Sequence, residues 1–103
     1  MRKFTVLFAV IALVAAVAAA SAFAATNVTW KIGTNKTVKI HKGGTVKWIW
    51  GDGAPHNVKG STFKSKVMTG KGKTYSHRFL SKGTFKVICQ VHPTSMKTVV
   101  KVI

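Results

Sequence analysis

From residue 28 onwards, short segments in which apolar and polar residues alternate follow one another along the sequence, separated by glycine-rich turns. Val46, Trp48 and Trp50 lie on one side of such a segment, and Lys42–Gly44 and Lys82–Gly83 are turn signals. The expected strands cover residues 28–32, 37–40, 45–50, 75–79, 85–89 and 97–103. None of the sequence after residue 24 has the pattern of a long amphipathic helix. The alternation therefore predicts an all-β domain of six or seven short strands, either a sandwich or a barrel.

The first 24 residues have the composition of an export signal. Arg2 and Lys3 precede an apolar run, Phe4–Ala20, in which Thr5 is the one polar residue. Ser21–Ala24 then offers a small-residue cleavage site, which is typical of a secretory signal peptide. The alternative is an uncleaved anchor, although the apolar run is at the lower limit for spanning a bilayer. We expect residues 1–24 to be a signal peptide, residues 25–103 to form one domain, and the protein to be exported to the periplasm or another extracytoplasmic space.

A domain of residues 25–103 is small, and this limits how it can be stabilised. Such a chain buries roughly 60–65% of its unfolded surface, so small exported domains usually add disulfides or a metal. Cys89 is the only cysteine, so no internal disulfide can form. A metal is therefore the favoured stabilising element, and an intermolecular bridge or a reactive thiol is the alternative.

The charge of the chain is strongly one-sided. Of the 17 Lys and Arg residues, Arg2 and Lys3 lie in the signal peptide, and Asp52 is the only acidic residue. The remaining net charge of about +14 predicts an acidic partner, an anionic surface such as a membrane, or both. Because there is no glutamate, paired-carboxylate catalysis is excluded, and we expect no enzyme. We interpret Asp52 as a loop-capping residue without a chemical role.

Two nearly uncharged stretches contain the candidate metal ligands. Residues 87–96 carry no charge and include Cys89, His92 and Met96, while residues 51–58 carry only Asp52 and include His56. A thiolate, two imidazoles and a thioether suit copper in both oxidation states, and His2Cys with a distant methionine is the blue-copper electron-transfer arrangement. The loop after an expected strand could supply three ligands, and His56 would come from a separate segment beside the rigid Pro55.

The stretches TVKWIWGDGAPHNV (45–58), YSHRFLSKGTFKVIC (75–89) and CQVHPTSMKTVVKV (89–102) resemble the small type 1 copper proteins, the cupredoxins of the plastocyanin, amicyanin and pseudoazurin group. The resemblance implies a Greek-key β-sandwich of about seven strands with one copper ion at one end. It implies His56, Cys89 and His92 as equatorial ligands, Met96 as the axial ligand, and Asn57 as a residue that ties the two ligand loops together.

The chain differs from these relatives in the spacing of the last two ligands. Three residues separate His92 from Met96, whereas amicyanin-like chains have two and plastocyanin-like chains have four. The spacing leaves the reduction potential and the colour open.

Several of these residues also have a purely structural interpretation. Cys89 lies on the same side of its expected strand as the apolar residues Phe85 and Val87, so it could be a core residue. Met96 precedes the last expected strand, where a core methionine is common. Pro-His-Asn also suits a turn, which gives His56 and Asn57 structural alternatives. His77, on the inward side of its segment, is expected to be a packed strand residue.

The favoured function is that of an exported one-electron carrier that cycles copper between Cu(I) and Cu(II). The resemblance implies electron exchange at the exposed edge of His92, and an uncharged docking patch is expected around it, formed by Ala54, Pro55, Val91 and Pro93. The lysines would steer an acidic redox protein into a transient complex with a monomeric carrier. The alternatives are a copper-delivery protein and a basic module that binds an anionic surface; no motif for specific nucleic-acid binding is present.

Overall fold

A computed structural model describes residues 24–103, so the expected signal peptide, apart from Ala24, lies outside the described residues. The described chain contains eight strands and no helix: β1 (Thr26–Trp30), β2 (Asn35–Ile40), β3 (Thr45–Trp50), β4 (Pro55–His56), β5 (Met68–Thr69), β6 (Thr74–Arg78), β7 (Gly83–Ile88) and β8 (Lys97–Val102). Accordingly, no helix of this part of the chain could cross a membrane.

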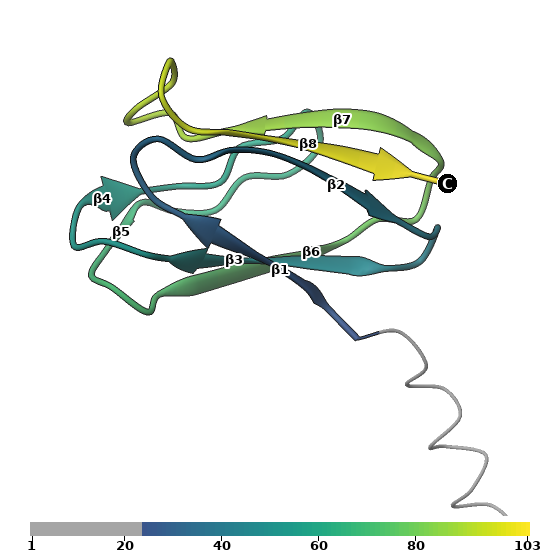
Figure 1. Cartoon of the computed structure of the whole chain (residues 1–103), viewed down its shortest axis with the longest axis horizontal. Coiled ribbons are helices and arrows are strands. Elements are labelled where there is room, and N and C mark those ends of the chain that lie inside the picture. The colour runs from purple at the N-terminus through teal and green to yellow at the C-terminus, as the bar shows by residue number, and fades with distance from the viewer. Residues whose placement is uncertain (1–23) are drawn as a thin grey trace, which may run out of the picture.

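Two three-stranded sheets lie face to face and form a β-sandwich (Figure 1). One sheet has the order β1-β3-β6 and the other the order β2-β8-β7, while β4 and β5 form a separate pair. The pairs β1–β3 and β2–β8 are parallel, and β3–β6 and β7–β8 are antiparallel. The chain crosses from one sheet to the other between β1 and β2 and again between β2 and β3, in agreement with the expected Greek-key sandwich. The all-β prediction is confirmed.

The core lies between the sheets, and its residues follow the alternation of the sequence. Trp48 of β3 is fully buried, as are its neighbours on the inward side of the strand. The Trp48 indole packs edge-on against Trp30, at 6.5 Å between ring centroids. Its Nε1–H donates to Thr98 Oγ1 of the opposite sheet, at 3.2 Å. A buried tryptophan thus adds apolar area and also joins the two layers through its polar atom.

The strand expected at residues 28–32 ends two residues earlier. The Thr34 N–H donates to the Lys31 carbonyl at 3.0 Å, and the Thr34 hydroxyl accepts from the Lys31 N–H and donates to the Thr29 carbonyl. These bonds form a tight turn that leaves Ile32 50% exposed. Strands β4 and β5 were not expected, because two residues are too few to show an alternation.

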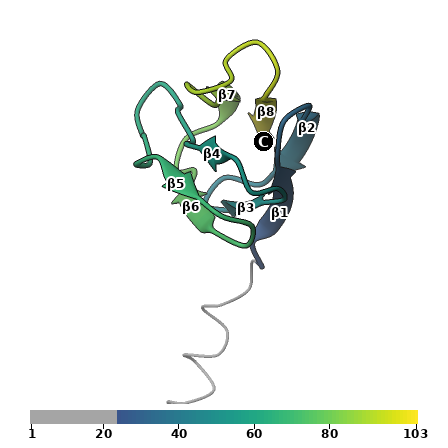
Figure 2. The same cartoon turned by 90° about the vertical axis from the view of Figure 1, so that its left-hand side faces the viewer.

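One end of the sandwich carries the candidate site. The pair β4–β5 and the loop between β7 and β8 lie at this end, as both views show (Figures 1 and 2). The two nearly uncharged stretches therefore lie at the same end of the sandwich.

Candidate metal centre

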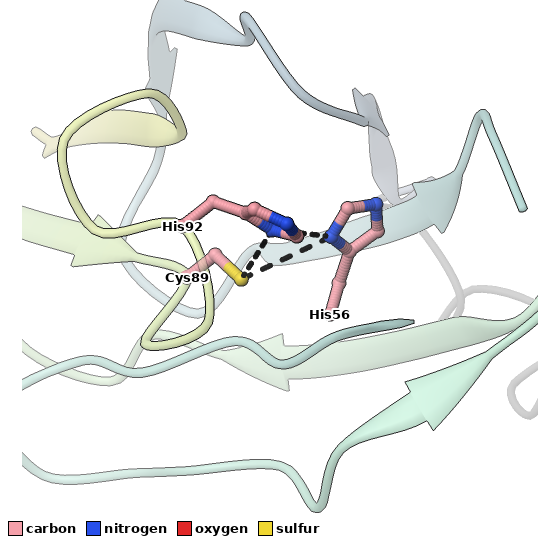
Figure 3. A group of neighbouring side chains, drawn as sticks. All are labelled: His56, Cys89 and His92. Atoms are coloured by element: carbon pink, nitrogen blue, oxygen red, sulfur yellow. Dashed lines mark hydrogen bonds between the residues drawn. The ribbon is translucent and has the colours of Figure 1, made fainter. Parts of the chain in front are cut away.

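Three side chains converge at the end of the sandwich (Figure 3). His56 ends β4, Cys89 follows β7, and His92 lies in the loop before β8. The Cys89 sulfur is 3.9 Å from His56 Nδ1 and 3.8 Å from His92 Nδ1, and the two Nδ1 atoms are 3.3 Å apart. His56 and Cys89 are fully buried, whereas His92 is half-buried and reaches the surface.

Backbone pairing brings the two ligand segments together. The Lys59 N–H donates to the Ile88 carbonyl at 2.8 Å, and the Ile88 N–H donates to the Lys59 carbonyl at 3.0 Å. This antiparallel bridge lies three residues after His56 and one residue before Cys89. Because both segments also belong to paired strands, the distance between imidazole and thiol is set by the sandwich rather than by the loops alone.

Asn57 makes a second connection between the same two segments. Its amide Nδ2 donates to Gln90 Oε1 at 2.8 Å, and its Oδ1 accepts from the Gln90 N–H at 2.7 Å. Its carbonyl oxygen accepts from the Trp30 indole at 3.0 Å. Asn57 is only 2% exposed, so these bonds also satisfy its buried polar atoms.

The loop from Cys89 to Met96 closes on itself. The Cys89 N–H donates to the Met96 carbonyl at 3.3 Å, and the Ser95 N–H donates to the His92 carbonyl at 3.1 Å. Gly33, at the turn after β1, donates its N–H to the Ser95 carbonyl at 2.8 Å. Met96 is buried, 1% exposed, at the end of this loop. Axial ligation by its thioether stays a prediction.

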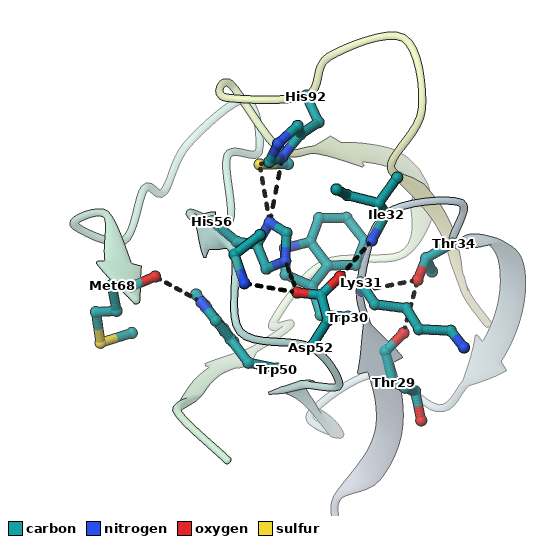
Figure 4. Close-up of polar contacts among 12 residues, drawn as sticks. Thr29, Trp30, Lys31, Ile32, Thr34, Trp50, Asp52, His56, Met68 and His92 are labelled. Carbon is teal, nitrogen blue, oxygen red and sulfur yellow. Dashed lines mark hydrogen bonds and ion pairs between the residues drawn. The ribbon is translucent and has the colours of Figure 1, made fainter. Parts of the chain in front are cut away.

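Asp52 contacts the candidate ligand His56, which the sequence did not suggest (Figure 4). Its Oδ1 lies 2.6 Å from His56 Nε2 and accepts from the Ala54 N–H, while Oδ2 accepts from the Ile32 N–H. Asp52 does cap its loop, as expected, but it also contacts a candidate ligand. Burial alone would raise the pKa of Asp52, but the hydrogen bonds from His56, Ile32 and Ala54 outweigh it and hold the pKa below its ordinary value. The only sequence signal for this contact was that Asp52 lies four residues before His56.

The residues of the expected docking patch reach the surface to different degrees. Pro55, Val91 and Pro93 are exposed and Ala54 is half-buried. Ile32, exposed by the turn after β1, also lies near this end, because its N–H bonds Asp52. The sequence had placed Ile32 in a strand, so it was not expected here.

Comparison with known proteins agrees with this geometry. Residues 33–103 match the family described as copper binding proteins, plastocyanin/azurin family. The chain belongs to this family. No curated protein sequence matches it significantly.

Solved structures of two kinds of cupredoxin are similar to the chain. A purple cupredoxin from Nitrosopumilus maritimus has 23% identity and a TM-score of 0.62, and the match covers 74% of this chain and 99% of that one. The reduced form of an amicyanin in which a tryptophan is replaced by tyrosine has 26% identity and a TM-score of 0.61, and the match covers 75% of this chain and 82% of that one. Another reduced amicyanin mutant reaches 28% identity and a TM-score of 0.62, with the same coverage.

The donor set fits the metal of this family. Two imidazoles and one thiol, all within 4.8 Å of one another, match the equatorial donors of a single type 1 copper site. Copper is therefore the cofactor, and the family and the site together support a copper-binding electron carrier.

Proposed function

We propose that this protein is a one-electron carrier of an extracytoplasmic space, with His56, Cys89 and His92 as equatorial copper ligands and Met96 as the axial ligand. The observation that carries the proposal is the convergence of two Nδ1 atoms and one sulfur at 3.3–3.9 Å. When bound, copper would supply a centre that gains and loses a single electron. The protein residues hold the donor atoms in place and keep water away.

The surroundings of the site favour retention of the metal. His56 and Cys89 are inaccessible to solvent, and Trp50 packs beside the His56 ring at 6.0 Å between centroids. The Trp50 ring is fixed by the bond from its Nε1–H to the Met68 carbonyl at 2.8 Å. Ligands that are held by the fold cannot easily move to follow a leaving ion. This favours electron transfer over copper delivery, and slow loss of copper to a mild chelator is expected.

The half-buried ring of His92 is the part of the site that a partner can approach. The surrounding patch of Ala54, Pro55, Val91 and Pro93, extended by Ile32, offers an uncharged contact surface. A small apolar contact suits a carrier that must dissociate after each transfer.

A groove beside this end is lined by lysines, and their positive charge indicates that the proposed partner is acidic. Ile88 of β7 pairs with Lys59 on one side and with Lys97 of β8 on the other, and Lys86 lies two residues away on the same face. These three lysines line one groove. In the other sheet, Lys47 and Arg78 are the only basic residues of the strands. An acidic redox protein fits this asymmetry, and it would be captured by long-range attraction that salt weakens.

The proposed carrier is exported and consists of one domain. Cleavage after Ala24 would release residues 25–103 as a single monomeric domain. The high positive charge would also allow contact with an anionic membrane surface, and this contact is compatible with electron transfer.

The site is tested by adding Cu(II) to the purified protein and recording the visible spectrum. We expect an intense sulfur-to-copper charge-transfer band that Cys89→Ser abolishes. Ser is close in size to Cys, so the loss would report the sulfur rather than the packing. His77→Phe, which changes a strand residue outside the site, should retain the band. A wild-type protein without the band, or a band that survives Cys89→Ser, would contradict the proposal.

The docking surface is tested by the rate of electron exchange with an acidic redox protein at two salt concentrations. We expect the variant Lys59→Gln, Lys86→Gln, Lys97→Gln to slow association at low salt and to reduce its salt dependence. The matched control is Lys42→Gln, Lys47→Gln, Lys82→Gln, which removes the same charge elsewhere. Equal effects of the two variants would show that only net charge matters, and would contradict the groove.

A further inference from the structure

The single carboxylate of the sequence lies against the buried ring of a proposed copper ligand. Asp52 Oδ1 is 2.6 Å from His56 Nε2, while His56 Nδ1 faces Cys89 and His92. We propose that Asp52 is a positioning residue, an inference that rests on the proposed copper site. It holds the His56 ring with its proton on Nε2, directs the Nδ1 lone pair into the site, and stabilises Cu(II) relative to Cu(I).

The first step is the identity of the proton-bearing nitrogen. A neutral imidazole has one donor nitrogen and one acceptor nitrogen. A carboxylate can only accept, so the 2.6 Å contact requires an N–H at Nε2 of His56. In the neutral ring Nδ1 is then left as the acceptor, which is the form that a metal ligand needs. His56 is 0% exposed, so no water replaces this partner.

The second step is the rigidity of the carboxylate itself. Oδ1 also accepts from the Ala54 N–H, and Oδ2 accepts from the Ile32 N–H, both at 3.1 Å. One bond comes from the loop of Asp52 and the other from the turn after β1, so the carboxylate is fixed from two directions. Figure 4 shows this chain of contacts from Ile32 through Asp52 to the ring of His56.

The third step is the charge. The ion-pair contact that Asp52 makes within the described residues is with His56, and none of the abundant lysines takes its place. A carboxylate that accepts from a ligand imidazole raises the basicity of the other nitrogen. Its negative charge also favours the more highly charged ion. Both effects stabilise Cu(II) more than Cu(I), so loss of the carboxylate should raise the reduction potential.

The test compares Asp52→Asn with the matched control Thr34→Val. Asn keeps the shape of Asp and carries no charge, but its NH2 must face either the Ile32 N–H or the N–H groups of both Ala54 and His56. Thr34→Val removes two hydrogen bonds from the same turn after β1 without touching His56. Three quantities are measured: the His56 tautomer in the metal-free protein by 15N NMR, the Cu(II) and Cu(I) dissociation constants by chelator competition, and the reduction potential.

We expect wild-type His56 to carry its proton on Nε2, and Asp52→Asn to increase the Nδ1–H population. We expect the same substitution to weaken Cu(II) binding by about 10–100-fold, to weaken Cu(I) binding less, and to raise the potential. Thr34→Val should leave all three near wild type.

Two results would overturn the proposal: a wild-type His56 protonated on Nδ1, or equal losses of Cu(II) and Cu(I) affinity in Asp52→Asn. The first measurement needs only the wild-type protein, so it decides the matter even if Asp52→Asn fails to fold. If the wild type binds no copper, the proposed function fails instead, and the tautomer still tests the positioning role.

Discussion

At the scale of single residues, the site depends on polar side chains that reach between segments far apart in the sequence. Asn57 joins the end of β4 to the residue after Cys89, and Asp52 joins the turn after β1 to His56. Asn57 and His56 are buried, so a bond that either of them loses leaves a polar atom that water cannot easily reach. Such residues should influence stability even when no metal is bound.

Replacing Asn57 with Ala should destabilise the metal-free protein by about 1–3 kcal/mol, because a side chain that is 2% exposed loses both of its hydrogen bonds to Gln90. The free energy of unfolding in urea measures this. Gln90→Ala is the control, since it removes only the bond made by an exposed side chain, and should cost about 0.5–1.5 kcal/mol. A smaller loss for Asn57→Ala than for Gln90→Ala would contradict the assigned connection.

His77 should make stability depend on pH. Its ring stacks on Phe63 at 3.8 Å and meets Phe79 edge-on at 4.8 Å, and burial there lowers its pKa below the ordinary value. The unfolded chain therefore binds more protons as the pH falls below about 6.5, and stability present at higher pH is lost. In the metal-free protein, wild type should lose more stability between pH 7.5 and pH 5 than His77→Phe.

The rest of the sequence is the same in both proteins, so contributions from other groups cancel in the comparison. Parallel pH profiles for wild type and His77→Phe, measured by urea unfolding, would show that the stacked ring does not titrate differently on folding.

At the scale of elements, a short irregular segment helps the long strands to hold the site. Residues 57–67, between β4 and β5, lack long strands, yet they carry the bridge from Lys59 to Ile88. The Gly60 N–H donates to the Phe63 carbonyl at 2.9 Å, and this turn places the Phe63 ring against Tyr75 and His77. The segment therefore packs on the sandwich through Phe63 and is hydrogen-bonded through Lys59 to β7, the strand that precedes Cys89.

A methyl group at Gly60 should disturb this element. A Cβ there would lie 2.4 Å from Phe63 ring carbons, so the ring or the turn must move. We expect Gly60→Ala to destabilise the protein by about 1–3 kcal/mol in urea unfolding. At Gly53 a Cβ would meet nothing within 4 Å, so Gly53→Ala should be neutral or stabilising by up to about 1 kcal/mol. Similar losses for both would contradict the packing argument.

At the scale of the whole molecule, the dominant feature is an uncompensated positive charge on a very small sandwich. The single carboxylate is engaged by a histidine, so the lysines have no acidic side chain in the sequence left to pair with. Their mutual repulsion destabilises the compact state. The same charge gives the molecule its attraction for acidic surfaces, so affinity and stability are expected to respond oppositely to salt.

Raising NaCl from about 10 mM to about 500 mM should stabilise the metal-free protein, because the screening length falls well below the size of the domain. A gain of about 1 kcal/mol would raise Tm by about 4–8 °C for a domain of this size. The variant Lys42→Gln, Lys47→Gln, Lys82→Gln should show a smaller rise. A Tm independent of salt in both proteins would mean that repulsion contributes little.

The sequence by itself determined the six longer strands, their buried sides and the residue types of the site. Alternation is a local property, so the inward positions of Val46 and Trp48 could be predicted without knowledge of the fold. The candidate ligands could be named because thiol, imidazole and thioether are rare in this chain and occur together in uncharged stretches.

Only the tertiary structure decided how the loops meet. The contact between Asp52 and His56, the exposure of Ile32 and the groove around Ile88 depend on where turns end and which segments lie side by side. Turn lengths of one or two residues, set by individual hydrogen bonds such as those of Thr34, leave no periodic signal in a sequence. The bond from Ile32 to Asp52 and the bridge from Lys59 to Ile88 form only when the strands have packed, because their partners come from segments far apart in the sequence.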